Sequence, residues 1–143
     1  MSTRSYVGVH HADTATVSVR YVHSDGTPGY MVPALGGIWR DTFAGDTAAM
    51  AAALLANSWD YLGVDVTAAT PSPFDDERPV AGVGMTMGVD PDDQTLTIAM
   101  SGVGSLDVGW VYLIDPADPS GAAITVYSVG NGDEPVARHP LTG

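Results

Sequence analysis

The sequence predicts an α+β fold: an antiparallel sheet of about six strands, in three hairpins, with two helices packed on one face. Two patterns support this. Residues 16–23 alternate apolar and polar side chains with the period of two expected of a half-buried strand, whereas residues 47–62 repeat apolar side chains at helical spacing. The helical segments lie together between strand-rich segments, which is typical of helices segregated on one face of a sheet.

The first hairpin occupies the N-terminal part of the chain. Residues 5–10 are a short β-prone run, and a turn-like segment separates them from residues 16–23. The hairpin should end at the turn of residues 24–29, which is rich in Gly, Pro and Asp. We expect His23 at the rim of the core face. The side chains that the second strand should bury are Val17, Val19 and Tyr21.

Two helices are expected in the middle of the chain. The first covers residues 30–43, with Pro33 in the first turn, where a helix tolerates proline. The second runs over residues 47–62 and is Ala-rich. Asp46 is a natural N-cap for it, and Gly63 fits the position after its last residue.

A loop and a second hairpin should follow the helices. Residues 64–79 carry three prolines, an acidic cluster and no periodicity, which indicates a surface loop. Alternating side chains in residues 81–89 and again in residues 95–100 predict two strands that pair as a hairpin. Glycines on one face of the first of these strands indicate close approach of a neighbouring backbone or helix.

The last hairpin should join residues 110–114 to residues 123–128, both rich in β-branched and aromatic side chains. Residues 130–143 are rich in turn formers and are expected to be an irregular tail. At 143 residues the chain has the size of one domain, which we place at residues 1–129.

The charge balance limits the classes of molecule that this protein is expected to bind. The chain has 17 acidic residues, 15 of them Asp, against five Arg and no Lys, for a formal charge of −12. Binding to a phosphate backbone depends on Lys and Arg that release counterions, so direct nucleic-acid binding is disfavoured, as is binding to anionic membranes. Most of the Asp residues lie in turns, where they are favoured for local hydrogen bonding.

Cysteine content and hydropathy indicate which chemistry is excluded and which cellular compartment to expect. Without cysteine the chain has no disulfide, no thiolate nucleophile and no cysteine-ligated metal. No apolar run approaches the ~18 residues of a spanning helix, and residues 1–6 lack the apolar segment of a secretory signal. We therefore expect a cytoplasmic protein with no membrane partner.

Several short motifs of the chain, taken together, are similar to motifs of a known group of proteins. The chain opens with M-S-T-R-S, continues with R-Y-V-H-S-D-G at residues 20–26, and later has W-V-Y-L-I-D at residues 110–115 before I-T-V-Y at residues 124–127. This combination resembles a scattered group of small uncharacterised bacteriophage and actinobacterial proteins that share an M-x-T-R-S start, a Y-x-H-x-D-G-Y-P turn and a late W-x-Y-x-I-D strand. The resemblance implies a phage or mobile-element setting and carries no established activity. Thr27 stands where that group has an aromatic residue before proline.

His23 and Asp25 are the candidate catalytic residues. A carboxylate near an imidazole fixes its tautomer and raises its basicity, which suits a general base. The structural alternative is that His23 caps the edge of the core while Asp25 forms an Asx-turn before Gly26.

A pocket for an anionic or aromatic small ligand is the binding hypothesis, because arginine binds anions in a fork geometry and aromatic side chains line such sites. Two alternatives stay open: Arg20, which points opposite to Tyr21, is a surface residue or salt-bridge partner, and the three tryptophans are core anchors. The residues expected to line the pocket are Arg4, Arg20, Tyr21, His23, Asp25 and Trp110.

Metal and cofactor sites are not expected. His10 and His11 could join His23 across the hairpin, but adjacent strand residues point to opposite faces, so at most one of them shares a site with it. A serine hydrolase is disfavoured because no G-x-S-x-G elbow is present, and no phosphate-binding loop ends in G-K-[ST].

The sequence therefore favours a non-enzymatic binding protein of phage or actinobacterial type, an accessory or counter-defence factor that captures a small ligand or a protein partner. One alternative is a small hydrolase that uses His23 and Asp25 as an acid–base pair. The other is an acidic module that mimics charge and binds a basic protein. The sequence leaves open whether the chain forms a homodimer, either through the glycine-lined strand or through an unpaired sheet edge.

Overall fold

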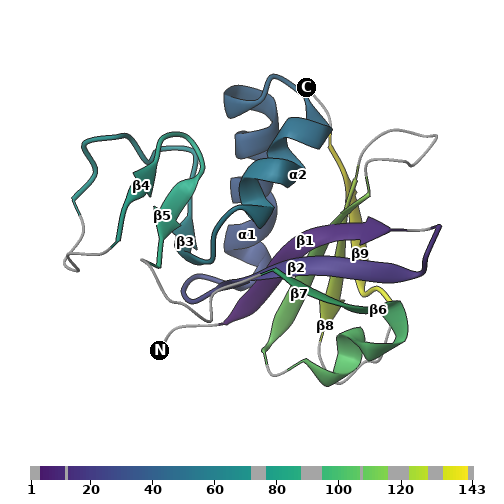
Figure 1. Cartoon of the computed structure of the whole chain (residues 1–143). Coiled ribbons are helices and arrows are strands. Elements are labelled where there is room, and N and C mark those ends of the chain that lie inside the picture. Colours follow the sequence, from purple (N-terminus) through teal and green to yellow (C-terminus); the bar gives the residue numbers. More distant parts are fainter. Residues whose placement is uncertain are drawn as a thin grey trace.

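The computed structural model describes residues 4–11, 13–71, 77–87, 95–106, 108–115, 123–128 and 134–141. These residues form an α+β fold with two α-helices on one face of a mixed sheet (Figure 1). The helical elements are α1 (Pro28–Gly37), the π-helical turn η1 (Ile38–Thr42), α2 (Thr47–Leu55) and the 3₁₀ helix η2 (Met100–Ser105). The strands are β1 (Ser5–His11), β2 (Thr16–Val22), β3 (Trp59–Leu62), β4 (Pro79–Val80), β5 (Gly84–Thr86), β6 (Leu96–Ala99), β7 (Trp110–Asp115), β8 (Ala123–Ser128) and β9 (Ala137–Pro140).

The sheet is larger than the sequence predicts. Within the described ranges it has nine strands, in the order β4-β5-β3-β2-β1-β7-β8-β9, with β6 paired to β2. Two pairings, β1 with β7 and β2 with β3, are parallel, so the expectation of six antiparallel strands is wrong. The α+β class itself is confirmed.

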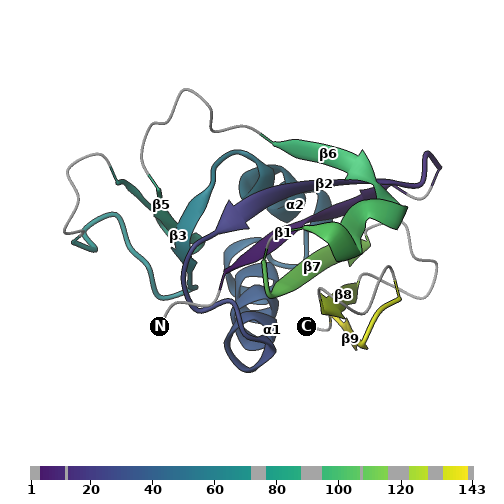
Figure 2. The same cartoon turned by 90° about the horizontal axis from the view of Figure 1, so that it is seen from below.

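Two of the three predicted hairpins are present. Strands β1 and β2 pair antiparallel along their whole length, and β7 and β8 do the same. The segment predicted as an irregular tail includes β9, which pairs with β8 and is followed by the buried Leu141. Figure 2, seen from the side opposite the helices, shows β6, β2, β1 and β7 side by side.

The second predicted hairpin is wrong in its pairing. Strand β5 pairs with β3 and β4, whereas β6 pairs with the first half of β2. Alternation identified these strands correctly, but it does not specify a partner. The predicted close approach is present at Gly84, where a Cβ would lie 2.5 Å from the carbonyl oxygen of Tyr61 on β3.

The second helix is shorter than predicted. It begins as expected, because the Asp46 side chain accepts a hydrogen bond of 3.1 Å from the backbone N–H of Ala49. It ends at Leu55, and residues 59–62 form β3 instead. The buried Trp59 indole donates to the carbonyl of Leu54 at 3.0 Å, which satisfies a free carbonyl at the helix end.

The first helix begins at Pro28, so Pro33 lies inside it and not in the first turn. The carbonyl of Gly29, which would accept from residue 33, is in an exposed part of the helix where water can bind it. The chain continues from α1 into η1, which closes with a bond of 3.2 Å from Phe43 N–H to the carbonyl of Ile38. None of the helices in the described ranges is long and apolar enough to cross a membrane.

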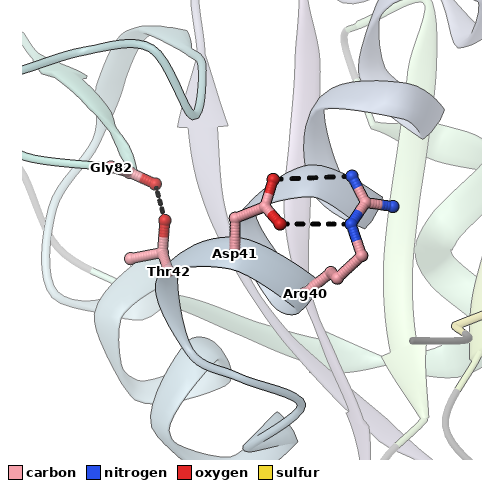
Figure 3. Close-up of polar contacts among 4 residues, drawn as sticks. All are labelled: Arg40, Asp41, Thr42 and Gly82. Atoms are coloured by element: carbon pink, nitrogen blue, oxygen red, sulfur yellow. Dashed lines mark hydrogen bonds and ion pairs between the residues drawn. The ribbon is translucent and has the colours of Figure 1, made fainter.

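The end of η1 is tied to the turn between β4 and β5. The Thr42 hydroxyl donates to the carbonyl of Gly82 at 2.6 Å, and Gly82 adopts a φ of +74°, a left-handed conformation that favours glycine (Figure 3). Beside this contact, Arg40 and Asp41 form an exposed ion pair at 3.2 Å. Thr42 thus connects the helical layer to the β3–β4–β5 end of the sheet.

Two apolar clusters cover the two faces of the sheet. The larger one joins the helices to one face and is built from side chains such as Val7, Val22, Leu35, Leu54 and Tyr112. The smaller one lies on the other face, against η2. Its buried members are Val17, Val19, Val103, Val111, Leu113 and Tyr127.

Gly8 permits the close pairing of β1 and β2. It stands opposite Val19 in the register. A Cβ at position 8 would overlap the carbonyl oxygen of Ser18 and lie 2.7 Å from the Cα of Val19. Both obstacles are backbone atoms of the neighbouring strand, so the strands would have to separate to admit any side chain.

We expect Gly8→Ala to lower the free energy of unfolding by about 3 kcal/mol, since overpacked positions that force backbone shifts cost this much. The measurement is urea denaturation followed by tryptophan fluorescence. Gly36→Ala is the matched control: a Cβ there has no neighbour within 4 Å, and alanine in a helix interior stabilises by about 1 kcal/mol relative to glycine. Equal effects of the two substitutions would contradict this account of Gly8.

Candidate functional site

The residues expected to line a pocket are divided between the two faces of the sheet. Arg20 is opposite Val7, and Trp110 is in register with Ser5, so both lie on the helix-covered face. Tyr21 is opposite Tyr6 on the other face. Arg20 is only 6% exposed, which excludes the alternative that it is a surface residue.

Four side chains gather on the face away from the helices, at the N-terminal end of β1 and the C-terminal end of β2. We call this group the N-terminal patch; it consists of Arg4, Tyr6, Tyr21 and His23. The Tyr21 hydroxyl lies 2.9 Å from Nδ1 of His23, and the Arg4 guanidinium is close enough to lower the pKa of Tyr21 through its charge and through hydrogen bonding. The rings of Tyr6 and Tyr21 meet edge to face with centroids 6.0 Å apart.

Tyr21 connects a cation to an imidazole. An arginine can only donate hydrogen bonds, so the hydroxyl proton of Tyr21 is available to Nδ1 of His23. Burial raises the pKa of Tyr21, and the positive charge of Arg4 opposes this shift. The phenol is therefore neutral at physiological pH, and it holds both neighbours in place while Arg4 and His23 stay exposed.

The turn after β2 carries Asp25, but His23 has a different partner from the one predicted. The imidazole bonds to Tyr21, while Asp25 adopts a left-handed φ of +58° in the turn. The turn is anchored from below by the buried Tyr112, whose hydroxyl donates to the carbonyl of Gly26 at 2.6 Å. An acid–base pair of His23 and Asp25 is thus not assembled by this turn.

His10 and His11 are far from His23. Both stand at the opposite end of the hairpin, next to the β1–β2 turn. Six residue steps along a strand separate the two ends by about 20 Å, so no histidine cluster forms across the hairpin. In the part of the chain that the structure describes, no group of three or more His, Asp or Glu side chains is arranged to hold a metal ion.

A second polar group, which we call the Ser18 network, lies on the helix-covered face. Ser18 Oγ is 2.9 Å from Nε2 of His11 and 3.1 Å from the hydroxyl of Thr97 on β6. Sequence reasoning missed it because the search for a reactive serine relied on the G-x-S-x-G motif. The available signal was the alternation of β1 and β2, which places His11 and Ser18 on one face once the register is known.

Burial of Tyr112 should make the free energy of unfolding depend on pH in the alkaline range. Burial raises the pKa of Tyr112 above its ordinary value of 10.0, so its protonated form stabilises the fold below pH 10 and this contribution is lost as the pH rises further. We expect Tyr112→Phe to lower the free energy of unfolding by about 1–3 kcal/mol at pH 7, because the buried Gly26 carbonyl loses its donor. Urea denaturation from pH 7 to pH 11 should show a shallower alkaline loss in the variant. An identical pH profile in both proteins would contradict this role.

In comparisons with protein-family models, curated proteins and solved structures, no match to this chain was found. Within the described residues, the N-terminal patch and the Ser18 network are two groups of polar side chains whose geometry suits binding or catalysis. They lie on opposite faces of the sheet, so each can act on its own.

Proposed function

We propose that this protein binds a small ligand that carries an aromatic ring and an anionic group, and that the N-terminal patch is the binding site. The single observation that supports this proposal is the group of Arg4, Tyr21 and His23, in which Tyr21 bonds to the exposed His23 and lies next to the exposed charge of Arg4. It presents a cation and an imidazole beside two tyrosine rings.

The chemistry of the patch suits an anion with an attached ring. A guanidinium binds carboxylate or phosphate through paired N–H groups. His23 offers its second ring nitrogen as another donor, since Nδ1 faces Tyr21. The aromatic rings of Tyr6 and Tyr21 supply apolar contact area for an aromatic group at low cost in side-chain entropy.

The distribution of charge favours a small ligand over a polyanion. The five Arg residues are dispersed along the chain, at positions 4, 20, 40, 78 and 138, and the formal charge is −12. A phosphate backbone would need many cations along one track, and the N-terminal patch has one Arg. One anionic group can be held locally by Arg4 and screened from the remaining acidic residues by solvent.

The patch also favours binding over the two alternatives. The acid–base alternative needs a carboxylate against His23, and the imidazole bonds to a phenol instead. The charge-mimic alternative needs an acidic surface, and the patch presents a cation. A phage or actinobacterial setting in the cytoplasm remains part of the proposal, supported by the resemblance at residues 20–26 and 110–115.

Phenyl phosphate is a suitable minimal probe, because it joins one ring to one anionic group. In ¹H–¹⁵N correlation spectra, titration with this probe should shift amide signals of residues 4–8 and 20–24 and few others. Arg4→Gln should weaken the binding about 10- to 100-fold, since a hydrogen bond to a charged group contributes about 1.5–3 kcal/mol.

The matched control is Arg40→Gln, which removes an exposed arginine from η1 at the cost of one surface ion pair. It should leave the affinity unchanged, because surface pairs contribute little. Inorganic phosphate should bind more weakly than phenyl phosphate if the tyrosine rings take part. Equal weakening by Arg4→Gln and Arg40→Gln, or shifts spread over the whole chain, would refute the site.

A further inference from the structure

We propose that Ser18 is a nucleophile activated by His11, and that it accepts acyl groups from activated esters of small carboxylic acids. The observation behind this inference is the pairing of a serine oxygen with an imidazole nitrogen at 2.9 Å, the distance at which a general base takes up a hydroxyl proton. This chemistry is independent of the N-terminal patch.

The pairing of the strands brings the two reacting groups together. In the β1–β2 register, Ser18 pairs with Val9 and Thr16 pairs with His11, so His11 and Ser18 are diagonal neighbours on one face. Strand β6 adds Thr97 directly opposite Ser18 from the other edge of β2. The nucleophile therefore stands on a central strand, between its base and a second hydroxyl.

The hydrogen bonds of Ser18 are consistent with a reactive oxygen. When Nε2 of His11 accepts, the Ser18 proton points to the imidazole. The Thr97 hydroxyl, 3.1 Å away, is then free to donate to the serine oxygen or to an oxygen that develops beside it. Ser18 is 8% exposed, so it is largely shielded from bulk water.

Positive charge lies close to this group. Arg20 is two residues further along β2 on the same face, about 7 Å away by strand geometry, and is 6% exposed. At this distance the cation acts through its electrostatic field, which favours the negative oxygen of a tetrahedral intermediate, and not as a hydrogen-bond donor to it. Thr95 donates to the carbonyl of Leu55 at 3.1 Å, which holds the start of β6 against the end of α2 beside this group.

The reaction is a two-step acyl transfer. Ser18 Oγ attacks the ester carbonyl carbon while His11 Nε2 takes the hydroxyl proton, and the bond from that carbon to the leaving oxygen breaks. The alcohol or phenol leaves with the proton returned by His11. Water then attacks the acyl-serine with His11 again as base, which releases the carboxylic acid and restores Ser18. The sum is ester plus water to acid plus alcohol.

The first test is covalent labelling of the intact protein with a fluorophosphonate probe. Its phosphorus forms a bond to the serine oxygen as fluoride leaves, and the proton passes to His11. We expect one adduct by intact-mass spectrometry and its location at Ser18 by peptide mapping. With p-nitrophenyl acetate, we expect release of nitrophenolate that prior labelling abolishes.

Variants test the role of the base. His11→Gln keeps a hydrogen-bonding side chain next to Ser18 but cannot accept the proton, and it should slow labelling by about 10²- to 10⁴-fold. His139→Gln is the matched control, because that imidazole is exposed on β9, at the far edge of the sheet from β2. Ser24→Ala removes a serine whose hydroxyl donates to the Asp60 carboxylate at 3.4 Å and not to an imidazole. Both controls should label at the wild-type rate.

The wild-type mapping decides the proposal even if a variant fails to fold. No adduct, an adduct on another serine, or equal labelling of folded His11→Gln and wild type would overturn the nucleophile. A Ser18 adduct without nitrophenolate release would overturn the assignment to acyl esters. Neither result bears on phenyl phosphate binding at the N-terminal patch, so the two proposals fail separately.

Discussion

The fold depends on which strands pair with each of the two edges of β2. One edge pairs with β1 along its full length, and the other edge is divided, with β6 on residues 16–19 and β3 joining at Val22. Every other part of the sheet is connected to this strand directly or through β1 and β3. Because Gly8 lets β1 approach so closely, the pairing of these two strands is the contact on which the remaining layers are built.

Local patterns predict the elements better than they predict their partners. The alternation in β1, β2, β7 and β8 identifies strands that also happen to pair with their sequence neighbours. For β5 and β6 the same kind of pattern is correct about extended backbone, but the partner of each strand is distant in sequence. Trp59 and Leu62 fit a helical stripe as well as a strand, and only the tertiary pairing of β3 with β2 and β5 decides between them.

In the candidate sites, too, the spacing of residues within a strand predicts some contacts, and the pairing of strands determines the others. Tyr21 and His23 lie on one face because of their spacing in the strand, which the sequence alone predicts, and Arg4 joins them only through the antiparallel register. Arg20 and Trp110 are residue types that suit a ligand pocket, so the sequence predicts them beside Tyr21 and His23, yet the register places both on the helix-covered face. The contact between His11 and Ser18 requires that register as well, so no motif search reveals it.

The alternation of β2 has a consequence for the kinds of sequence change this chain can accept. Ser18 and Tyr21 are three residues apart and therefore face opposite sides, one toward the helices and one away from them. Insertion or deletion of a single residue between them would reverse the face of everything on one side of the change, exposing apolar side chains and burying the patch. Changes of two residues would preserve the faces and alter only the spacing along the strand. Length variation in homologous chains should therefore accumulate in the turns that flank β2 and be absent from the strand itself.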